Sequence, residues 1–284
     1  MKNFRAYFLL FIAVVALCSC DLAKNNKALI SEAGKVLVEE LDQKDGEAGA
    51  CDASAGADDK LVMQTSPKGT PEQILKRTGY VASYNKTTLL PNWVAWHLTA
   101  ERTEGSAKRS GVDFAEDTEV PEPRATDWDY YNSGYDRGHM CPAADNKWSK
   151  KAMEESFLFT NMCPQNGNLN RGDWNEMEMA CRKWAKKYGD LYIVCGPILY
   201  KGKHKTIGKN KVVVPEAFFK VVLRTGDDPQ AIGFIYKNTS GNRPKDSYVN
   251  TVDEVERITG IDFFPSLPDN VEKNVEATAD IANW

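Results

Sequence analysis

Residues 136–139 read Asp-Arg-Gly-His and bring an acid, a fixed cation and a titratable imidazole into four consecutive positions. Histidine accepts a proton near neutral pH, and the N–H donors of arginine match phosphate oxygens. The chain has only three histidines, at positions 97, 139 and 204, which nearly excludes a zinc or di-metal site built from several histidines. A string this short is more often structural than catalytic, so its meaning depends on a second group of residues.

The second group is a cluster of asparagines at positions 161, 166, 168 and 170, where a strand is expected to pass into a helix. Helix capping needs only one of them. An amide oxygen could instead be held toward a hard divalent cation, because Mg²⁺ keeps several waters and accepts only one or two protein oxygens. Glu178 follows Asn170 by eight residues, about two helical turns, so both side chains can point to the same side.

Taken together, these residues resemble the DNA/RNA non-specific endonuclease family, which has the ββα-metal (His-Me finger) active site. The resemblance covers about residues 75 to 265 and also includes the upstream strand 92–98 and the pair Lys108-Arg109. Its specific motifs are Asp136-Arg-Gly-His139, Thr160-Asn-Met-x-Pro-Gln165, and Asn170 with Trp174 and Glu178 four and eight residues later.

The resemblance implies a role for each matching residue. His139 matches the general base that activates water, and Asn170 matches the ligand of Mg²⁺, for which Mn²⁺ is an alternative. Asn161 and Glu178 match accessory catalytic positions, with Glu178 holding a water on the metal.

Two arginines match residues that act on the phosphate or its transition state. Arg137 lies inside the Asp-Arg-Gly-His string, whereas Arg109 precedes a loop without rigid spacing. Arg102 and Arg124 are therefore alternatives to Arg109.

The implied reaction is a Mg²⁺-dependent hydrolysis of phosphodiester bonds in DNA and RNA. Contacts to phosphates carry no sequence information, so low specificity is expected. Two alternatives stay open. One is a non-catalytic surface lipoprotein that binds nucleic acid or a protein partner on the same fold. The other is a phosphodiesterase with a narrower substrate.

The surrounding pattern predicts an α+β fold with a mixed, mostly antiparallel central sheet and flanking helices. Helices are expected from Thr70, over 174–188 before Gly189, and over 252–258 between Thr251 and Gly260. Residues 101–134 should form a long loop. Strands are expected over residues 80–84, 93–98, 157–162, 191–195, 212–214, 217–223 and 231–235.

Composition and charge set further limits. The chain has 284 residues, 42% of them hydrophobic, and a formal net charge of −4, which argues against binding nucleic acid through bulk positive charge. Residues 113–133 carry seven acids and one arginine, whereas residues 146–211 carry thirteen Lys or Arg and six acids. The basic segment, with Lys183, Lys186 and Lys187 on its helix, is either a track for a polyanion or a solvated face.

The amino terminus suggests export. Two positive charges and an apolar run lead to Leu17-Cys18-Ser19-Cys20, which resembles a bacterial lipoprotein cleavage site. We therefore expect a signal peptide over residues 1–19, lipid on Cys20, an acidic flexible tether over 20–66 and the endonuclease domain over 67–284. The protein would sit in the bacterial cell envelope and contact the membrane only through its lipid anchor. An ordinary cleaved signal with secretion is the alternative.

Four cysteines lie in the predicted domain. Cys141 and Cys163 each follow a motif residue by two positions, and Cys181 and Cys195 lie on a helix and the next strand. Each of these pairs could form a disulfide in an exported protein, or stay as free buried thiols.

Overall fold

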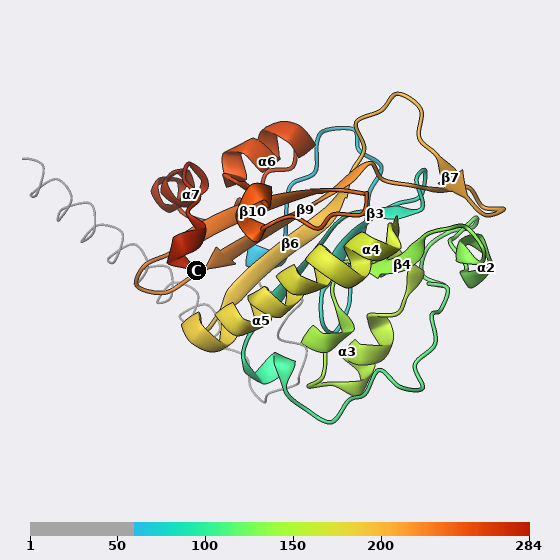
Figure 1. Ribbon diagram of the computed structural model, residues 1–284, viewed down its shortest axis with the longest axis horizontal. Helices are drawn as coiled ribbons and strands as arrows, with labels where there is room; N and C mark the ends of the chain where they lie inside the picture. The colour runs from blue at the N-terminus through green and yellow to red at the C-terminus, as the bar shows by residue number, and fades with distance from the viewer. Residues whose placement is uncertain (1–59) are drawn as a thin grey trace, which may run out of the picture. The chain divides into compact units, whose positions relative to one another are not determined.

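The computed structural model describes residues 60–284 (Figure 1). Within these residues seven strands form one sheet in the order β1-β2-β3-β6-β9-β10-β11, with every neighbouring pair antiparallel. This confirms the predicted α+β class. The strands are β1 (Gln73–Lys76), β2 (Val81–Asn85), β3 (Leu90–Leu98), β6 (Leu191–Ile198), β9 (Ala217–Arg224), β10 (Gln230–Lys237) and β11 (Val249–Asn250).

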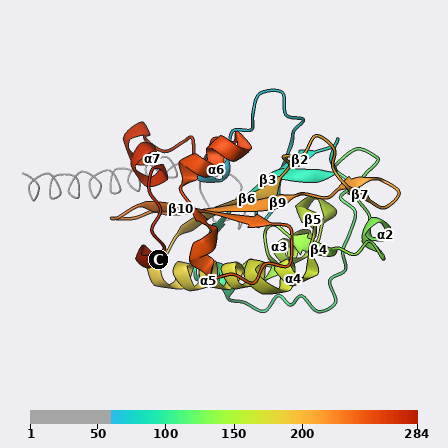
Figure 2. The ribbon, with the colours of Figure 1, turned by 45° about the horizontal axis from the view of Figure 1, so that its top comes forward.

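Helices cover both faces of this sheet. Figure 2 shows α6 (Val252–Thr259) and α7 (Asp269–Glu276) on one face and α5 (Asn175–Tyr188) on the other, where α5 packs against β6. The face that carries α5 also carries a separate two-stranded ribbon, formed by β4 (Asp136–His139) and β5 (Met162–Gln165). The remaining elements are α2 (Asp127–Tyr130), α3 (Lys150–Glu155), α4 (Gly167–Leu169), the π-helical turn η5 (Asn170–Trp174), β7 (Thr206–Ile207) and β8 (Val212–Val213), with 3₁₀ turns η1 (Lys60–Val62), η2 (Glu101–Thr103), η3 (Ala143–Asp145), η4 (Phe159–Asn161), η6 (Lys245–Tyr248) and η7 (Ile281–Asn283).

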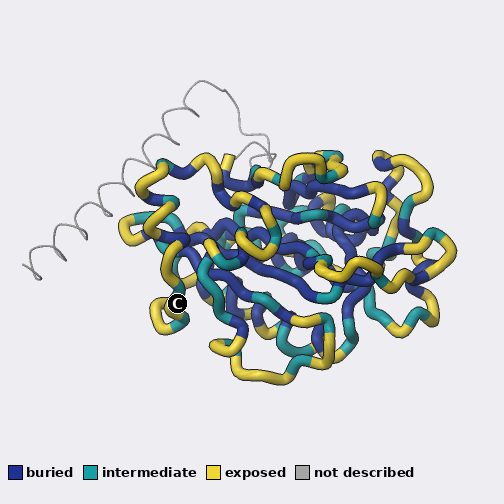
Figure 3. Tube along the Cα trace, turned by 90° about the horizontal axis from the view of Figure 1, so that it is seen from above, coloured by how far each residue is buried: buried dark blue, intermediate teal, exposed yellow. Residues whose placement is uncertain are grey.

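The long helix α5 forms where the sequence predicts it. Its apolar stripe, which includes Met177, Cys181 and Trp184, is buried against the sheet. Gly189, with φ of 90°, ends the helix. The strands behind it are buried on both sides, which explains why β9 reads as an almost continuous apolar run. Figure 3 shows this distribution, with buried backbone in the sheet and exposed backbone in the connecting loops.

Two predicted elements are wrong. The helix expected from Thr70 is instead the strand β1, because pairing with β2 over Gln73–Lys76 outweighs the local capping signal. The strand expected over Phe157–Met162 is a 3₁₀ turn followed by β5, since Phe157 and Phe159 point into the core from a turn. The long loop predicted over 101–134 is present but contains η2 and the short helix α2.

The folded body begins before the predicted boundary at residue 67. Leu61 and Val62 are each 1% exposed, and Thr65 pairs with Asp262. Residues 60–66 therefore belong to the body rather than to the tether. The predicted signal peptide, Cys20 and the rest of the tether lie outside the described residues. Of the helices over residues 60–284, none has the length and apolar character needed to cross a bilayer.

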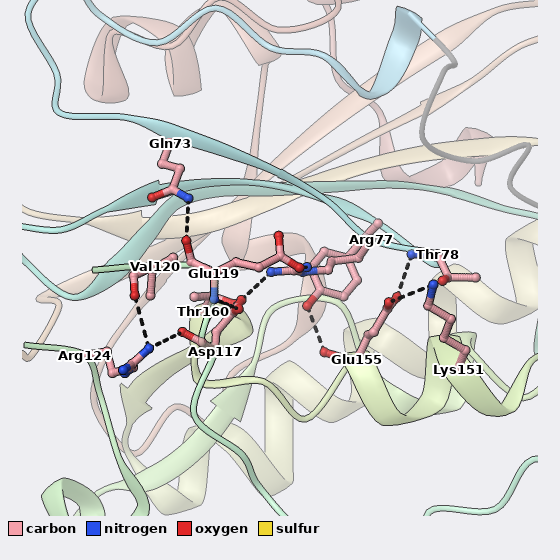
Figure 4. Close-up of polar contacts among 11 residues, drawn as sticks. Gln73, Arg77, Thr78, Asp117, Glu119, Val120, Arg124, Lys151, Glu155 and Thr160 are labelled. Atoms are coloured by element: carbon pink, nitrogen blue, oxygen red, sulfur yellow. Dashed lines mark hydrogen bonds and ion pairs between the residues drawn. The ribbon is translucent and has the colours of Figure 1, made fainter. Parts of the chain in front are cut away.

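Part of the acidic segment 113–133 is held inside the fold (Figure 4). Asp117 is 4% exposed and accepts bonds from Arg77 Nη2 at 2.6 Å and from Thr160 Oγ1 at 2.7 Å. Arg124 Nη1 donates to the carbonyl oxygens of Asp117 and Val120. These contacts fix the segment next to Thr160, the residue that precedes Asn161.

Candidate active site

A cleft of about 940 Å³ opens between β4, the η5 turn, the start of α5 and the loops near residues 105–114 and 142–147. It gathers five of the six residues that the sequence singled out for catalysis and metal binding. These five are Arg109, Arg137, His139, Asn170 and Glu178.

The β4–β5 ribbon positions the first of these side chains. Arg137 and His139 are two residues apart on β4, so both project to the same side of the ribbon. Gly138 lies between them, opposite Cys163. A Cβ at this position would lie 2.4 Å from Oε1 of Gln165, so glycine here leaves room for the side chain of Gln165 to pack against the strand.

His139 lies at the end of β4 in an apolar setting and is 8% exposed. Its ring packs edge-on against Phe157 at 4.9 Å and near Phe114 at 5.7 Å, while Trp174 donates to its carbonyl oxygen. Burial, with the charge of Arg109, lowers the pKa of His139 to about 3. The imidazole is therefore neutral at physiological pH. Its Nε2 is buried without a hydrogen-bond partner among the described residues, which leaves Nδ1 as the nitrogen to meet water.

Arg137 is fixed on several sides. Its Nε and Nη2 both reach Asp127 at 2.6 Å, and its guanidinium lies over the rings of Phe114 and Tyr130. These contacts therefore fix the orientation of the Arg137 guanidinium in the absence of a ligand.

Arg109 is the second arginine that lines the cleft. It is exposed and lies over Phe157, the same ring that packs on His139, at 5.5 Å. The two alternatives are engaged elsewhere, because Arg102 Nη1 donates to the carbonyl oxygen of His97 and Arg124 binds Glu122 and the acidic segment. Neither lines the cleft.

Asn170 enters the cleft from the η5 turn, which is broken from regular helix at Gly172. Its Nδ2 donates to Oδ2 of Asp136 at 3.0 Å, and Arg171 donates to the same oxygen at 2.7 Å. This bond fixes the amide so that its oxygen, Oδ1, is turned away from Asp136. An amide oxygen held in this way is a suitable ligand for a hard cation.

Glu178 reaches the cleft from α5 and is half-buried. Burial raises the pKa of its carboxyl to about 7, although the nearby charges of Lys220 and Arg182 work in the opposite direction. A carboxylate that is costly to ionise alone gains from an adjacent cation. Glu178 lines the same cleft as Asn170, whose amide oxygen is the kind of ligand that Mg²⁺ accepts.

Asn161, the sixth predicted residue, does not line the cleft and is 0% exposed. Its Oδ1 accepts from the backbone N–H of Cys141, and its Nδ2 donates to the carbonyl oxygens of Cys141 and Ser156. It cannot touch a substrate from this position. Its side chain ties the chain beyond β4 to the turn before β5, so it is a positioning residue.

Several cationic residues of the cleft had no predicted catalytic role, although Lys108 belongs to the upstream pair and Lys147, Arg171 and Arg182 belong to the basic segment 146–211. Arg182 lines the cleft, with Nη1 bound to the buried Asp145 at 2.9 Å, and its place four residues after Glu178 on one helix was the available signal. Lys108, Lys147 and Arg171 also line it.

The three lysines of α5 lie outside the cleft. Lys183, Lys186 and Lys187 do not line the cleft, and Lys186 pairs with Glu104 at 2.5 Å. The prediction that they deliver a polyanion to the metal has no support from their position.

The four cysteines of the domain are free and buried. Of the two alternatives for Cys141–Cys163 and Cys181–Cys195, the structure therefore has free buried thiols rather than disulfides. The thiols act as small apolar residues with weak polar contacts, as Cys195 Sγ shows by donating to the carbonyl oxygen of Met140 at 3.3 Å. Burial raises the pKa of Cys181 and of Cys195 to about 12, which makes them unreactive.

The role of Asn161 can be tested directly. Asn161→Ala should lower the free energy of unfolding by about 3 kcal/mol, because it leaves buried backbone groups of Cys141 and Ser156 without partners. Asn168→Ala, at an exposed position of the same asparagine cluster, is the matched control and should change stability little. Chemical denaturation measures both. Equal stability of the two variants would contradict the positioning role.

The sequence of the chain is similar to those of known nucleases. The sequence profile of the DNA/RNA non-specific endonuclease family matches residues 58–270. Nuclease EXOG, mitochondrial, of Danio rerio is 39% identical over 206 residues, 67% of this chain and 60% of that protein. Nuclease C1 of Cunninghamella echinulata var. echinulata is 36% identical over 222 residues, 72% of this chain and 88% of that protein.

The fold is also similar to that of a solved structure. A chain in the crystal structure of the EndoG/EndoGI complex aligns with this chain with a TM-score of 0.67 at 31% sequence identity. The alignment covers 69% of this chain and 87% of that chain. With three quarters of its length matched by the family profile, the chain belongs to the DNA/RNA non-specific endonuclease family.

Proposed function

We propose that this protein is a metal-dependent endonuclease that hydrolyses phosphodiester bonds in DNA and RNA without reading sequence or sugar. One observation carries the proposal: a buried neutral imidazole, an amide and carboxylate pair, and several cations share one cleft. The cationic residues that line it are Lys108, Arg109, Arg137, Lys147, Arg171 and Arg182, against the acids Asp136 and Glu178.

His139 is the base in this proposal. Its neutral ring would accept a proton from the water that attacks phosphorus, through Nδ1. The charge of Arg109 contributes to its low pKa. A phosphate paired with Arg109 would offset that charge, so His139 would become more basic when substrate binds.

Other residues of the cleft would stabilise the phosphate. Arg137, already oriented by Asp127, would donate to its oxygens as negative charge builds up. Asn170 would hold a divalent cation, Mg²⁺ or Mn²⁺, and Glu178 would hold one of its waters. The cation would stabilise charge on the phosphate and the leaving 3′ oxygen. Asp136 would keep Asn170 in its orientation.

The substrate range follows from these contacts. All of them are directed at phosphate, so they carry no sequence information. Where neither a base edge nor the 2′-hydroxyl is read, DNA and RNA are both substrates. The nuclease names of the relatives support this interpretation over that of a non-catalytic lipoprotein.

The decisive assay uses circular DNA and RNA, each with Mg²⁺ and with excess chelator. His139→Ala should lose activity by about a hundred- to ten-thousand-fold, as expected for loss of a general base. His97→Ala is the matched control, because His97 pairs with Asp190 and stacks on Tyr192 outside the cleft. Near-normal cleavage by His139→Ala would remove it from the mechanism. Full activity in chelator would disprove metal dependence.

The cleft, not the basic helix, should govern attraction of the substrate. Lys108 and Lys147 are exposed and line the cleft. Their joint replacement by glutamine should raise KM and reduce the slope of log kcat/KM against log salt by about two for double-stranded DNA. The control is Lys183→Gln with Lys187→Gln, which removes the same charge outside the cleft. Equal salt slopes for both double variants would contradict this assignment.

We also propose that Cys20 carries lipid and anchors the nuclease in the bacterial cell envelope. The support is the apolar run that ends in Leu17-Cys18-Ser19-Cys20. Cys20→Ala should abolish incorporation of labelled fatty acid, measured on the full chain in cells. Undiminished labelling of that variant would refute the anchor.

A further inference from the structure

A group of acidic side chains belongs to α6 and α7, the helices on the face of the sheet opposite α5 (Figure 2). Oxygens of Asp253 and Glu256, three residues apart on α6, and of Glu276, the last residue of α7, all lie within 4.8 Å of one another. Within residues 60–284 none of the three forms an ion pair with Lys or Arg. Three carboxylates this close repel one another strongly unless something positive lies between them.

Glu276 is the unusual member of the group. It is 6% exposed, and its Oε1 is buried with no hydrogen-bond partner among the described residues. Burial raises the pKa of its carboxyl to about 9, and the charges of Glu256, Glu272, Asp253 and Asp262 add to this. A proton on Glu276 would relieve only its own share of the repulsion, because Asp253 and Glu256 would remain charged. A cation in the group would offset the charges of all three carboxylates and give the buried Oε1 a partner.

We propose that Asp253, Glu256 and Glu276 form a Ca²⁺-binding site that joins α6 to α7. Ca²⁺ takes six to eight oxygens in a flexible geometry, and carboxylates can bind it through one or both oxygens. Mg²⁺ fits less well, because it keeps most of its waters and rarely occupies a site made of protein carboxylates alone.

The surroundings of the three carboxylates support this assignment. The backbone N–H of Phe263 donates to Oε1 of Glu256 at 2.8 Å, which orients that carboxylate and leaves its other oxygen for the ion. Both helices also pack against β10. An ion here would bind the two helices to each other and so strengthen the layer on this face of the sheet.

The experiment measures thermal unfolding of the full chain against added Ca²⁺. Because the cleft is itself expected to bind a divalent cation, the measurement is made in wild type and in Asn170→Ala. At a hundred times Kd, Ca²⁺ should raise the melting temperature of both by about 5 °C or more. Mg²⁺ at the same concentration should raise that of Asn170→Ala by much less.

Two variants test the site itself. Glu276→Gln and Asp253→Asn should lose the Ca²⁺ shift, whereas Glu254→Gln should keep it, because Glu254 pairs with Arg257 on the same helix. Glu276→Gln removes a buried repulsion, so in chelator it should melt above wild type, and saturating Ca²⁺ should reverse that order.

Three results would overturn the proposal. The first is a Ca²⁺ shift that survives Glu276→Gln, and the second is a shift that disappears in Asn170→Ala, which would place the ion in the cleft. The third is the absence of any shift in wild type, which would make Glu276 a protonated carboxyl. The nuclease assay reports on the cleft separately, so failure here leaves the proposed function standing.

Discussion

The arrangement of the cleft depends on the pairing of two four-residue strands, β4 and β5. The side chain of Gln165 packs so close to Gly138 that a side chain there would clash with it, and the strand alternation of β4 points Arg137 and His139 to the same side. Asn161 connects the segment after β4 to the turn before β5 through hydrogen bonds with the backbone of Cys141 and Ser156. Thr160 continues the connection to the buried pair of Asp117 and Arg77. A short ribbon, marginal by itself, is thus held by polar contacts that reach the edge of the main sheet.

Buried charges of both signs lie close together near Glu178. Lys220 of β9 is buried between Trp96 and Trp174, with its Nζ 5.1 Å and 4.4 Å from the ring centres. Burial alone would lower the pKa of Lys220, but neighbouring Cys195, Cys181, Glu178 and Asp145 raise it above the ordinary value. This buried cation offsets part of the acidic charge beneath the cleft.

Much of the cleft could be predicted from the sequence because its residues lie in short motifs with fixed spacing. The interval from Asn170 to Glu178 predicts a shared side, and both line the cleft, even though an irregular turn at Gly172 separates Asn170 from the regular helix. The apolar stripe of α5 likewise predicts a helix without further information. These features are local, so neighbouring residues determine them.

The wrong or missing predictions concern residues whose environment is set by partners distant in the chain. Thr70 begins a good capping signal, but the chain after it pairs with β2. Asn161 has the residue type of a ligand, and only its bonds to Cys141 and Ser156 show that it faces inward. Lys220 lies within an apolar run that gives no sign of the acidic groups beneath it. Spacing alone could not supply these contacts.

The four unpaired cysteines have a consequence for where such a nuclease can mature. Over residues 60–284 the thiols are buried and free, so the folded state is held by packing and hydrogen bonds without a covalent cross-link. Its stability is then independent of the thiol–disulfide poise of the surroundings. For residues 60–284, no pair of cysteines has to be oxidised before this packing can form.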